Sequence, residues 1–146
     1  MIETKLTQLC LQIAKEAHAG QLDKAGKPYI EHPTHLAEQM SIEETAAIAL
    51  LHDVLEDGEG WTREKLLQRG VPEVVVENVE YLTRPAEGTY MDYIRSLKSK
   101  PLAKQVKLAD LRHNMDLSRL PEITERDLSR KKRYEKAIRI LEGEKE

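Results

Sequence analysis

The sequence predicts an all-α protein with about seven or eight helices, and three observations support this fold class. Apolar residues recur three and four positions apart in most segments, which is the spacing of an amphipathic helix. Aromatic residues make up only 4% of the chain and Phe is absent, so the core must consist mainly of aliphatic side chains. Short connections containing Gly and Pro separate the apolar segments, as in helical folds with short loops.

The composition of the 146 residues indicates one globular domain, residues 1–146, with a charged tail from about residue 142. A net charge of −3 predicts no general affinity for nucleic acid. We find no basic-then-apolar leader and no apolar run near the roughly 18 residues of a membrane span. The single cysteine, Cys10, cannot form an internal disulfide and fits a reducing, cytoplasmic setting.

Three helices are expected in the first part of the chain. The first covers residues 6–17, and a polar loop follows it. Pro33 is well placed as the first residue of the second helix, which puts His32 at its N-cap. Ser41 and Glu44 form a capping box that starts the central helix.

In the second part, Thr62 can cap a short helix that extends to Gly70. A Val-rich segment follows Pro72. Pro in the first turn and the apolar spacing to Leu82 favour a helix there over a strand. The remaining helices are predicted over residues 90–97, over residues 102–117 and after a cap at Thr124.

The central stretch, residues 46–57, reads AAIALLHDVLED and is the most informative part of the chain. Its first six residues are all apolar, which is typical of a helix buried among other helices. Four ionisable residues then follow within six positions: His52, Asp53, Glu56 and Asp57. Charges next to a core cost several kcal/mol unless they are compensated, and a bound cation is one way to compensate them.

On one continuous helix, Asp53 would share a face with Glu56 and Asp57. His52 and Asp53 would point about 100° apart and could meet only on an ion off the helix flank. We therefore predict a metal site. The alternative is a surface cluster of acids at the entry to the next loop.

A second cluster lies in the segment VKLADLRHNM, residues 106–115. Asp110 interrupts an otherwise apolar helix face, and Asn114 follows one turn later on the same face. A lone helical Asp is more often solvated or paired with a cation. The apolar neighbours and the amide one turn later favour a metal ligand here.

Together these segments resemble the HD-domain metal-dependent phosphohydrolases. More closely, the chain is similar to their alarmone-hydrolase branch, which includes the hydrolase domain of RelA/SpoT-type proteins and the stand-alone metazoan SpoT homologue. The matching segments are GKPYIEHP (26–33), ALLHDVLED (49–57) and VKLADLRHNM (106–115), in the same order and at similar spacing. The similarity extends from the first helix to about Leu120 and implies an HD-domain helical fold around one Mn²⁺ ion.

The resemblance also implies a role for each matching residue. The metal ligands would be His32, His52, Asp53 and Asp110. Two carboxylates offset the charge of a divalent ion, and two neutral imidazoles add nitrogen donors. Glu56 and Asp57 match the acidic pair that positions or activates the attacking water. Lys24 and Asn114 match residues that face a nucleotide substrate, with Lys107 and Arg112 as further cations for its phosphates.

Two departures from the family pattern concern the substrate. Asp23 stands before Lys24 where the family usually has Arg, and an acid cannot stack on guanine as Arg does. After Asp110 the order is Leu-Arg-His-Asn and not Arg-Leu-His-Asn, which moves the basic residue about 100° round the helix. The other two histidines, His18 and His35, match no ligand position.

Three functions follow as hypotheses. The first is a 3′-pyrophosphohydrolase of (p)ppGpp or a related nucleotide. The second is a nucleotidase or phosphatase acting on another nucleotide such as NADPH, which Asp23 keeps open. The third is a metal- or nucleotide-binding sensor without activity. Glu56 and Asp57 argue against the sensor, because a binding module needs ligands but no acids that activate water.

Overall fold

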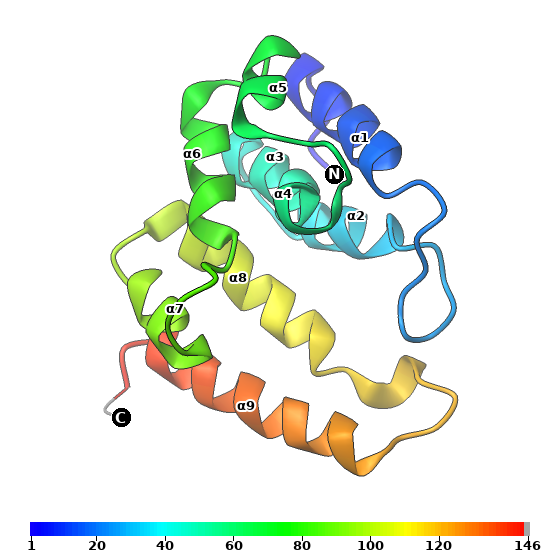
Figure 1. Cartoon of the computed structure of the whole chain (residues 1–146), viewed down its shortest axis with the longest axis vertical. Coiled ribbons are helices and arrows are strands. Elements are labelled where there is room, and N and C mark those ends of the chain that lie inside the picture. The colour runs from blue at the N-terminus through cyan, green and yellow to red at the C-terminus, as the bar shows by residue number, and fades with distance from the viewer. Residues whose placement is uncertain (145–146) are drawn as a thin grey trace.

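A computed structural model describes residues 1–144, which form nine α-helices and one short 3-10 helix. The all-α prediction is confirmed (Figure 1), and the only β-type pairing among these residues is an isolated antiparallel bridge between Leu22 and Pro28. The helices are α1 (Lys5–Ala17), α2 (Glu31–Glu38), α3 (Glu43–Leu51), α4 (Val54–Asp57), α5 (Arg63–Gln68), α6 (Glu73–Leu82), α7 (Tyr90–Ser96), α8 (Pro101–Asn114), η1 (Leu117–Arg119) and α9 (Glu125–Leu141).

Helix α3 is the centre of the fold. Every residue from Thr45 to Leu51 is buried, as its uniformly apolar sequence predicts. It packs against α1, α2, α6 and α8. Burial of each large aliphatic side chain contributes about 1.5–3 kcal/mol of transfer free energy, so this helix is a major source of stability.

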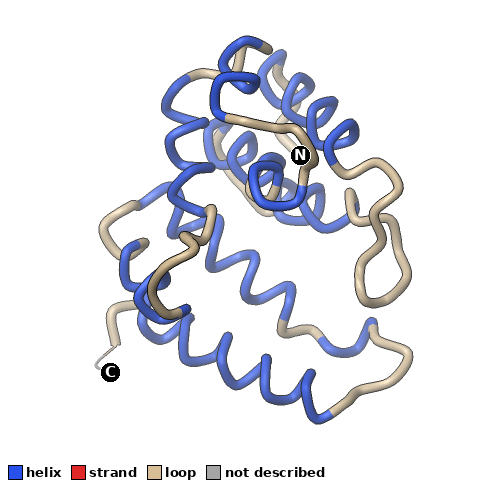
Figure 2. The backbone as a smooth tube through the Cα atoms, in the orientation of Figure 1, coloured by secondary structure: helices blue, strands red, loops and turns tan. Residues whose placement is uncertain are grey.

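Helix α8 joins two parts of the molecule. It contacts α2, α3 and α6 on one side and α9 on the other, and α9 also packs on α7. Figures 1 and 2 show α8 crossing between the group α1–α6 and the long C-terminal helix. Its inner face carries Ala103, Val106 and Leu111, so Asp110 lies beside the core.

The predicted cap of α2 is wrong. The helix begins at Glu31, so His32 is its second residue and not its N-cap. The chain already turns before it, because the backbone N–H groups of Glu31 and His32 donate to the carbonyls of Pro28 and Tyr29 at 3.1 and 3.0 Å. Pro33 is tolerated since the first turn of a helix leaves its N–H groups without intrahelical partners.

The predicted capping box of the central helix is also wrong. Helix α3 begins at Glu43 after Ile42, without a hydrogen bond from a capping side chain. The carboxylate of Glu43, the first residue of α3, instead accepts a hydrogen bond of 2.6 Å from the hydroxyl of Thr4, the N-cap residue of α1, which ties the starts of the two helices together.

The predicted side-chain caps and the helix predicted after Pro72 are confirmed. Thr62 and Thr124 cap α5 and α9 with their side chains, and the segment after Pro72 is the helix α6. The predicted helix over 102–117 stops at Asn114, and η1 follows it. In the charged tail, Glu142 accepts a hydrogen bond from Arg112, while residues 145–146 lie outside the described part.

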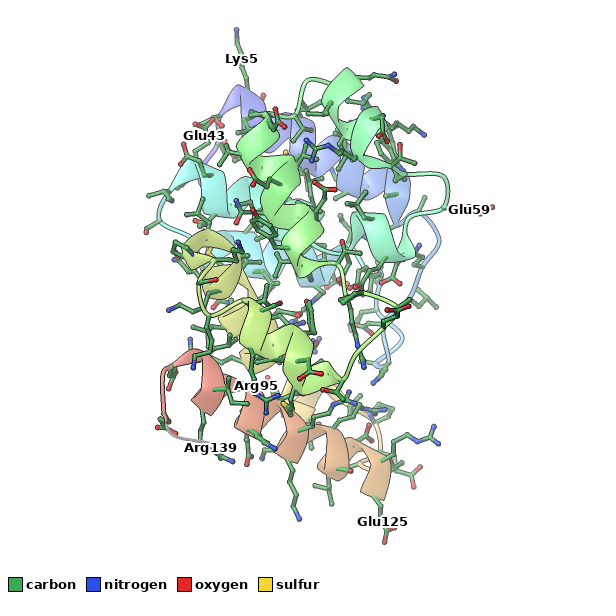
Figure 3. The ribbon with its side chains drawn as sticks, turned by 60° about the vertical axis from the view of Figure 1, so that its left-hand side comes forward. Lys5, Glu43, Glu59, Arg95, Glu125 and Arg139 are labelled. Carbon is green, nitrogen blue, oxygen red and sulfur yellow. The ribbon has the colours of Figure 1, made fainter. Side chains whose placement is uncertain are left out.

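Charged side chains cover the outside of the molecule. Figure 3 shows Lys5, Glu59 and Glu125 extending outward from well-separated segments. No helix in residues 1–144 combines the length and the apolar character that crossing a membrane requires.

Candidate metal centre and adjoining clefts

The central segment is not one continuous helix, which corrects the geometry expected for residues 46–57. Helix α3 ends at Leu51, and the single-turn helix α4 starts at Val54. The His52 ring contributes to the break, since its Nδ1 lies 2.7 Å from the carbonyl oxygen of Ala49. The turn lets His52 and Asp53 meet directly, with Nε2 only 3.1 Å from Oδ2.

The structure brings the four predicted metal ligands together from three elements. His32 lies in α2, His52 and Asp53 lie in the turn between α3 and α4, and Asp110 lies in α8. His32 Nε2 is 2.8 Å from Asp110 Oδ1, and His52 Nε2 is 3.6 Å from the same oxygen. Donor atoms of His32, His52 and Asp53 all lie within 4.8 Å of one another.

These residues fit a divalent cation. The Ala49 carbonyl can only accept, so Nδ1 of neutral His52 carries the proton and Nε2 presents a lone pair. This Nε2 is buried and makes no hydrogen bond, although carboxylate oxygens lie beside it. A cation between the imidazole and the carboxylates satisfies all of them, and a mixed nitrogen and oxygen donor set suits a first-row transition metal.

The charges of the centre support the same reading. Burial lowers the pKa of His52, but Asp53 and Asp110 outweigh it and raise the pKa well above its ordinary value. Burial raises the pKa of Asp53, but His52 more than offsets this and lowers it to about 2. The buried carboxylate of Asp110 and the half-buried carboxylate of Asp53 therefore demand positive charge, which a proton on His52 supplies when no metal does.

A further layer of hydrogen bonds holds the ligands in place. Nδ1 of His32 lies 2.7 Å from Nδ1 of His113, and the two rings are stacked. Burial is the main cause that lowers the pKa of His113 to about 4, and the charge of His32 is the second. His113 is therefore neutral and can accept a hydrogen bond from the His32 N–H. Tyr29 donates its hydroxyl to Asp53.

Asp110 is held from both sides. Lys107 Nζ donates to Oδ2 and the Asn114 amide donates to Oδ1, each at 3.0 Å. Burial raises the pKa of Asp110, but Lys107 is the largest of the groups that bring it well below its ordinary value. Lys107 and Asn114, both predicted as substrate contacts, thus also orient Asp110, a predicted metal ligand.

The acidic pair lies next to the ligand set. Carboxylate oxygens of Asp53, Glu56 and Asp57 fall within 4.8 Å of one another despite the helix break. Glu56 also accepts a hydrogen bond from the backbone N–H of Arg84. Burial and the charge of Asp53 raise the pKa of Glu56 and of Asp57.

Two clefts open beside the centre. The larger encloses about 340 Å³, and its wall includes His32 and Tyr29. The smaller encloses about 110 Å³ and contains the other three ligands together with Glu56. The polar and aromatic residues around the larger cleft are Asp23, Lys24, Asn114, Asp116, Arg119, Asp127, Arg130 and Tyr134, and those around the smaller are Arg84, Tyr90, Tyr93 and Lys107.

The predicted substrate contacts are distributed unevenly. Lys24 and Asn114 line the larger cleft and Lys107 lines the smaller. Arg112 lines neither and instead pairs with Glu142 at 2.6 Å. Its place on the opposite face of α8 follows from its position two residues after Asp110.

Sequence reasoning missed several residues of these sites. Tyr29 and His113 lie within the matched segments, so their proximity to ligands in the sequence was an available signal. Arg119 and Arg130 enter the larger cleft from η1 and α9, and no local pattern relates them to it. Asp23, the departure noted above, pairs with Arg119 at 3.6 Å.

Comparison with known proteins assigns the class. The chain belongs to the HD domain family, which matches residues 10–120. A solved structure described as a metazoan ortholog of SpoT that hydrolyzes ppGpp and plays a role in starvation responses has a TM-score of 0.78 at 24% identity. The match covers 98% of this chain and 89% of that chain, and it confirms the predicted HD-domain fold.

Relatives with more similar sequences are much longer proteins. A probable GTP pyrophosphokinase of Mycobacterium leprae is 35% identical over 122 residues, which is 75% of this chain and 15% of the relative. The bifunctional (p)ppGpp synthase/hydrolase SpoT of Escherichia coli K12 is 36% identical, with 70% of this chain and 16% of the relative covered. A guanosine-3′,5′-bis(diphosphate) 3′-pyrophosphohydrolase of Haemophilus influenzae is 33% identical, with 70% and 17% covered. The chain thus spans about one sixth of their length.

Proposed function

We propose that this protein is a metal-dependent phosphohydrolase that removes the 3′-pyrophosphate of (p)ppGpp or a related nucleotide. The products would be GDP or GTP and pyrophosphate. The observation that carries the proposal is the pair of acids, Glu56 and Asp57, beside a set of two imidazoles and two carboxylates. The names of the longer relatives support the choice of substrate.

His32, His52, Asp53 and Asp110 would hold the ion, for which we propose Mn²⁺. When bound, such an ion lowers the pKa of a water ligand and polarises a phosphoryl oxygen. His113 and the Ala49 carbonyl fix both imidazoles with Nε2 toward the centre. Lys107 and Asn114 fix the carboxylate of Asp110.

Glu56 and Asp57 would accept the proton of the attacking water. Their raised pKa values make them stronger bases than ordinary surface carboxylates, which favours proton transfer near neutral pH. The hydrogen bond from the Arg84 backbone holds Glu56 at the smaller cleft. The water would attack the phosphorus next to the ribose, and the bond from that phosphorus to the ribose 3′-oxygen would break, with the 3′-oxygen taking up a proton. Lys107, on the same cleft, can offset negative charge that develops on the phosphoryl oxygens.

The larger cleft would hold the nucleoside and its 5′-phosphates. Its volume of about 340 Å³ lies within the range of small-molecule sites. Lys24, Arg119 and Arg130 supply positive charge around it, and Tyr134 offers an aromatic surface. Arg112 has no part in this proposal, because it lies away from both clefts.

A second candidate is a phosphatase of another nucleotide, such as NADPH, at the same centre. Asp23 favours it, since a carboxylate on the wall of the larger cleft cannot stack on guanine. Asp23 also forms an ion pair with Arg119, so the Arg119 guanidinium is less available to contact the base or a phosphate.

The test is hydrolysis by the Mn²⁺-loaded protein of a panel containing ppGpp, ppApp, GTP and NADPH, with pyrophosphate and orthophosphate measured separately. We expect pyrophosphate from ppGpp, with Asp110→Asn as the inactive control. If orthophosphate is released from NADPH and no other nucleotide is hydrolysed, the phosphatase candidate replaces the (p)ppGpp pyrophosphohydrolase. No hydrolysis of any member would refute both.

A further inference from the structure

Two arginine side chains beside the smaller cleft are not used by the proposed function. Arg84 lines this cleft from the loop between α6 and α7, and Arg133 lies on α9. Both lie against the ring of Tyr90, the first residue of α7, which also lines the cleft. The guanidinium carbon of Arg84 is 5.3 Å from the centroid of that ring, and the guanidinium carbon of Arg133 is 4.6 Å from it. The packing of α7 on α9 (Figure 1) brings the two arginines to one place.

No carboxylate neutralises these two side chains. Within residues 1–144, the guanidinium groups of Arg84 and Arg133 form no ion pair and no hydrogen bond. Two like charges beside one ring repel each other, and a bound anion would offset that repulsion. The alternative is that both groups are only solvated, since both residues are exposed. Their contacts with one aromatic ring favour fixed positions at the cleft over free extension into water.

The arginines of the larger cleft are different. Arg119 pairs with Asp23, and Arg130 pairs with Asp127. The unpaired guanidinium groups thus lie on the side of the smaller cleft, which also contains Glu56 of the acidic pair.

A third cation lies within the smaller cleft. Lys107 Nζ is 5.3 Å from the centroid of the Tyr93 ring, and this ring is 6.0 Å from that of Tyr90. Lys107 donates to Asp110, and an ammonium group has three N–H donors, so it can also donate to a bound anion. Positive charge therefore extends from the metal centre along two tyrosine rings to Arg84 and Arg133.

The volume of the smaller cleft suits a phosphate group. At about 110 Å³ it is well below the roughly 300–1,000 Å³ of sites for drug-sized ligands, so a nucleoside belongs in the larger cleft. The smaller cleft contains His52, Asp53 and Asp110, which places the reacting phosphorus at its inner end. A group bonded to that phosphorus on the side away from the nucleoside would extend toward Arg84.

We propose that Arg84, Arg133 and Lys107 bind the outer phosphate of the 3′-pyrophosphate. The smaller cleft then selects nucleotides with a pyrophosphate on the ribose over those with a single phosphate there. The outer phosphate keeps its bond to the reacting phosphorus throughout, so this subsite acts in binding and not in bond breaking. Guanidinium groups suit the role because their planar donors bind phosphate oxygens in pairs. This inference rests on the proposed pyrophosphohydrolase function.

Calorimetric titration of the Mn²⁺-loaded protein with inorganic pyrophosphate and with orthophosphate tests the subsite without turnover. Excess Mn²⁺, with metal analysis after each titration, ensures that pyrophosphate does not remove the ion. Arg84→Met and Arg133→Met should each raise the Kd for pyrophosphate by about 5-fold or more, because each removes charge-assisted hydrogen bonds. The Kd for orthophosphate should be unchanged, because a single phosphate would bind at the metal centre.

Three results of these titrations would overturn the proposal. They are no binding of pyrophosphate by the wild type, an unchanged Kd for pyrophosphate in both Met variants, and an equal change for both anions. Arg139→Met is the matched control, since Arg139 is an exposed arginine of α9 that lines neither cleft, and it should bind pyrophosphate as the wild type does.

Conservative variants separate charge from structure. Arg84→Lys and Arg133→Lys keep a positive charge and should retain part of the affinity that the Met variants lose. The hydrogen bond from residue 84 to Glu56 comes from the backbone, so it remains in every variant. A loss of affinity as large in the Lys variants as in the Met variants, together with a lower Tm, would mean that the arginines are structural and would overturn the proposal.

Steady-state kinetics extend the test to the substrate. The Met variants should raise KM for ppGpp with little change in kcat, as expected when binding is lost equally in the ground state and the transition state. The inhibition constant of guanosine 5′-diphosphate 3′-monophosphate, which lacks the outer phosphate, should stay that of the wild type.

The failure of this inference and the failure of the proposed function give different results. Cleavage of ppGpp with KM and pyrophosphate affinity unchanged in both Met variants would refute the subsite and leave the proposed function in place. If the wild type cleaves no nucleotide but binds pyrophosphate through Arg84 and Arg133, the proposed function fails and the pyrophosphate subsite stands.

Discussion

The metal centre and the larger cleft are adjacent, yet they are built on different principles. The predicted ligands of the centre are short side chains on α2, on α8 and in the turn between α3 and α4, and all four have hydrogen-bond partners outside the ligand set. The cleft is lined by long side chains from a loop, from η1 and from α9, such as Lys24, Arg119 and Arg130. Rigid short side chains suit chemistry that needs precise placement. Long exposed ones suit a binding surface that can change between relatives while the chemistry stays the same.

The strongest test of the rigid centre removes one of its ligands. His52→Ala or Asp110→Ala should each abolish metal binding and activity, and should lower Tm, because a buried group of opposite charge is left uncompensated. Metal analysis, turnover and calorimetry measure the three effects. Arg112→Ala, on the same part of the chain but away from both clefts, is the control. Full metal content in either ligand variant would mean that the centre is not the metal site.

Substitutions in the acidic pair, Glu56 and Asp57, should lower the rate of the chemical step without changing metal binding. Glu56→Gln and Asp57→Asn should each lower kcat by about 10²-fold or more, since general-base catalysis typically contributes that much. Metal content should be unchanged, because the proposed ligand set of two imidazoles and two carboxylates includes neither residue. Glu59→Gln alters an exposed acid nearby and should behave as wild type. Loss of metal in the variants would place these acids among the ligands.

The second layer of the centre can be tested at His113. His113→Phe keeps a flat ring but removes the acceptor for the His32 N–H, so metal affinity should fall by about 10- to 100-fold. Titration of the metal-free protein with Mn²⁺ measures this. His35→Phe is the matched control, since His35 stacks on His113 without a hydrogen bond to a ligand. Equal affinities in both variants would show that His32 needs no such support.

The affinity for metal should also depend on pH. In the metal-free protein Asp53 and Asp110 hold the pKa of His52 well above its ordinary value, although burial opposes them. A ligand must lose this proton, so metal binding releases it and affinity falls as pH decreases below the raised pKa. Calorimetry in buffers of different ionisation enthalpy counts the released protons. Proton release near zero at neutral pH would contradict the charge state inferred for His52.

The smallest effect is expected in the cleft. Asp23 Oδ1 accepts from the backbone N–H groups of Ala25 and Lys27 at 2.9 and 3.0 Å, so this residue also shapes its loop. Asp23→Asn keeps that acceptor but removes the charge that holds Arg119. Arg119 is exposed and its guanidinium lies 3.6 Å from the Asp23 carboxylate, so this ion pair should be worth only about 0–1 kcal/mol. KM for ppGpp should therefore fall by at most a few-fold, with kcat unchanged.

Asp23→Arg goes further, because it adds a guanidinium that can stack on a purine and loses the turn acceptor. We expect it to raise the preference for ppGpp over ppApp, measured as the ratio of kcat/KM values. Unchanged selectivity would mean that the base is recognised elsewhere in the cleft.

The sequence alone was sufficient to predict the helical class, most helix positions and the four residues that meet at the centre. Helical periodicity and caps such as Thr62 and Thr124 are local properties, so they can be recognised without a structure. His52, Asp53 and Asp110 interrupt apolar runs, and the cost of burying charge is what made them stand out. His32 was predicted as a ligand only from the resemblance to the HD-domain family.

Tertiary structure decided the features that depend on partners distant in the chain. It broke the central helix at His52 and Asp53, and it tied the start of α3 to the start of α1 through the bond from Thr4 to Glu43. It also joined Asp23 to Arg119 and brought Arg130 to the same cleft from α9. Such contacts form because the helices must bury their apolar faces against one another. That packing fixes which polar side chains then meet, and no local pattern contains the information.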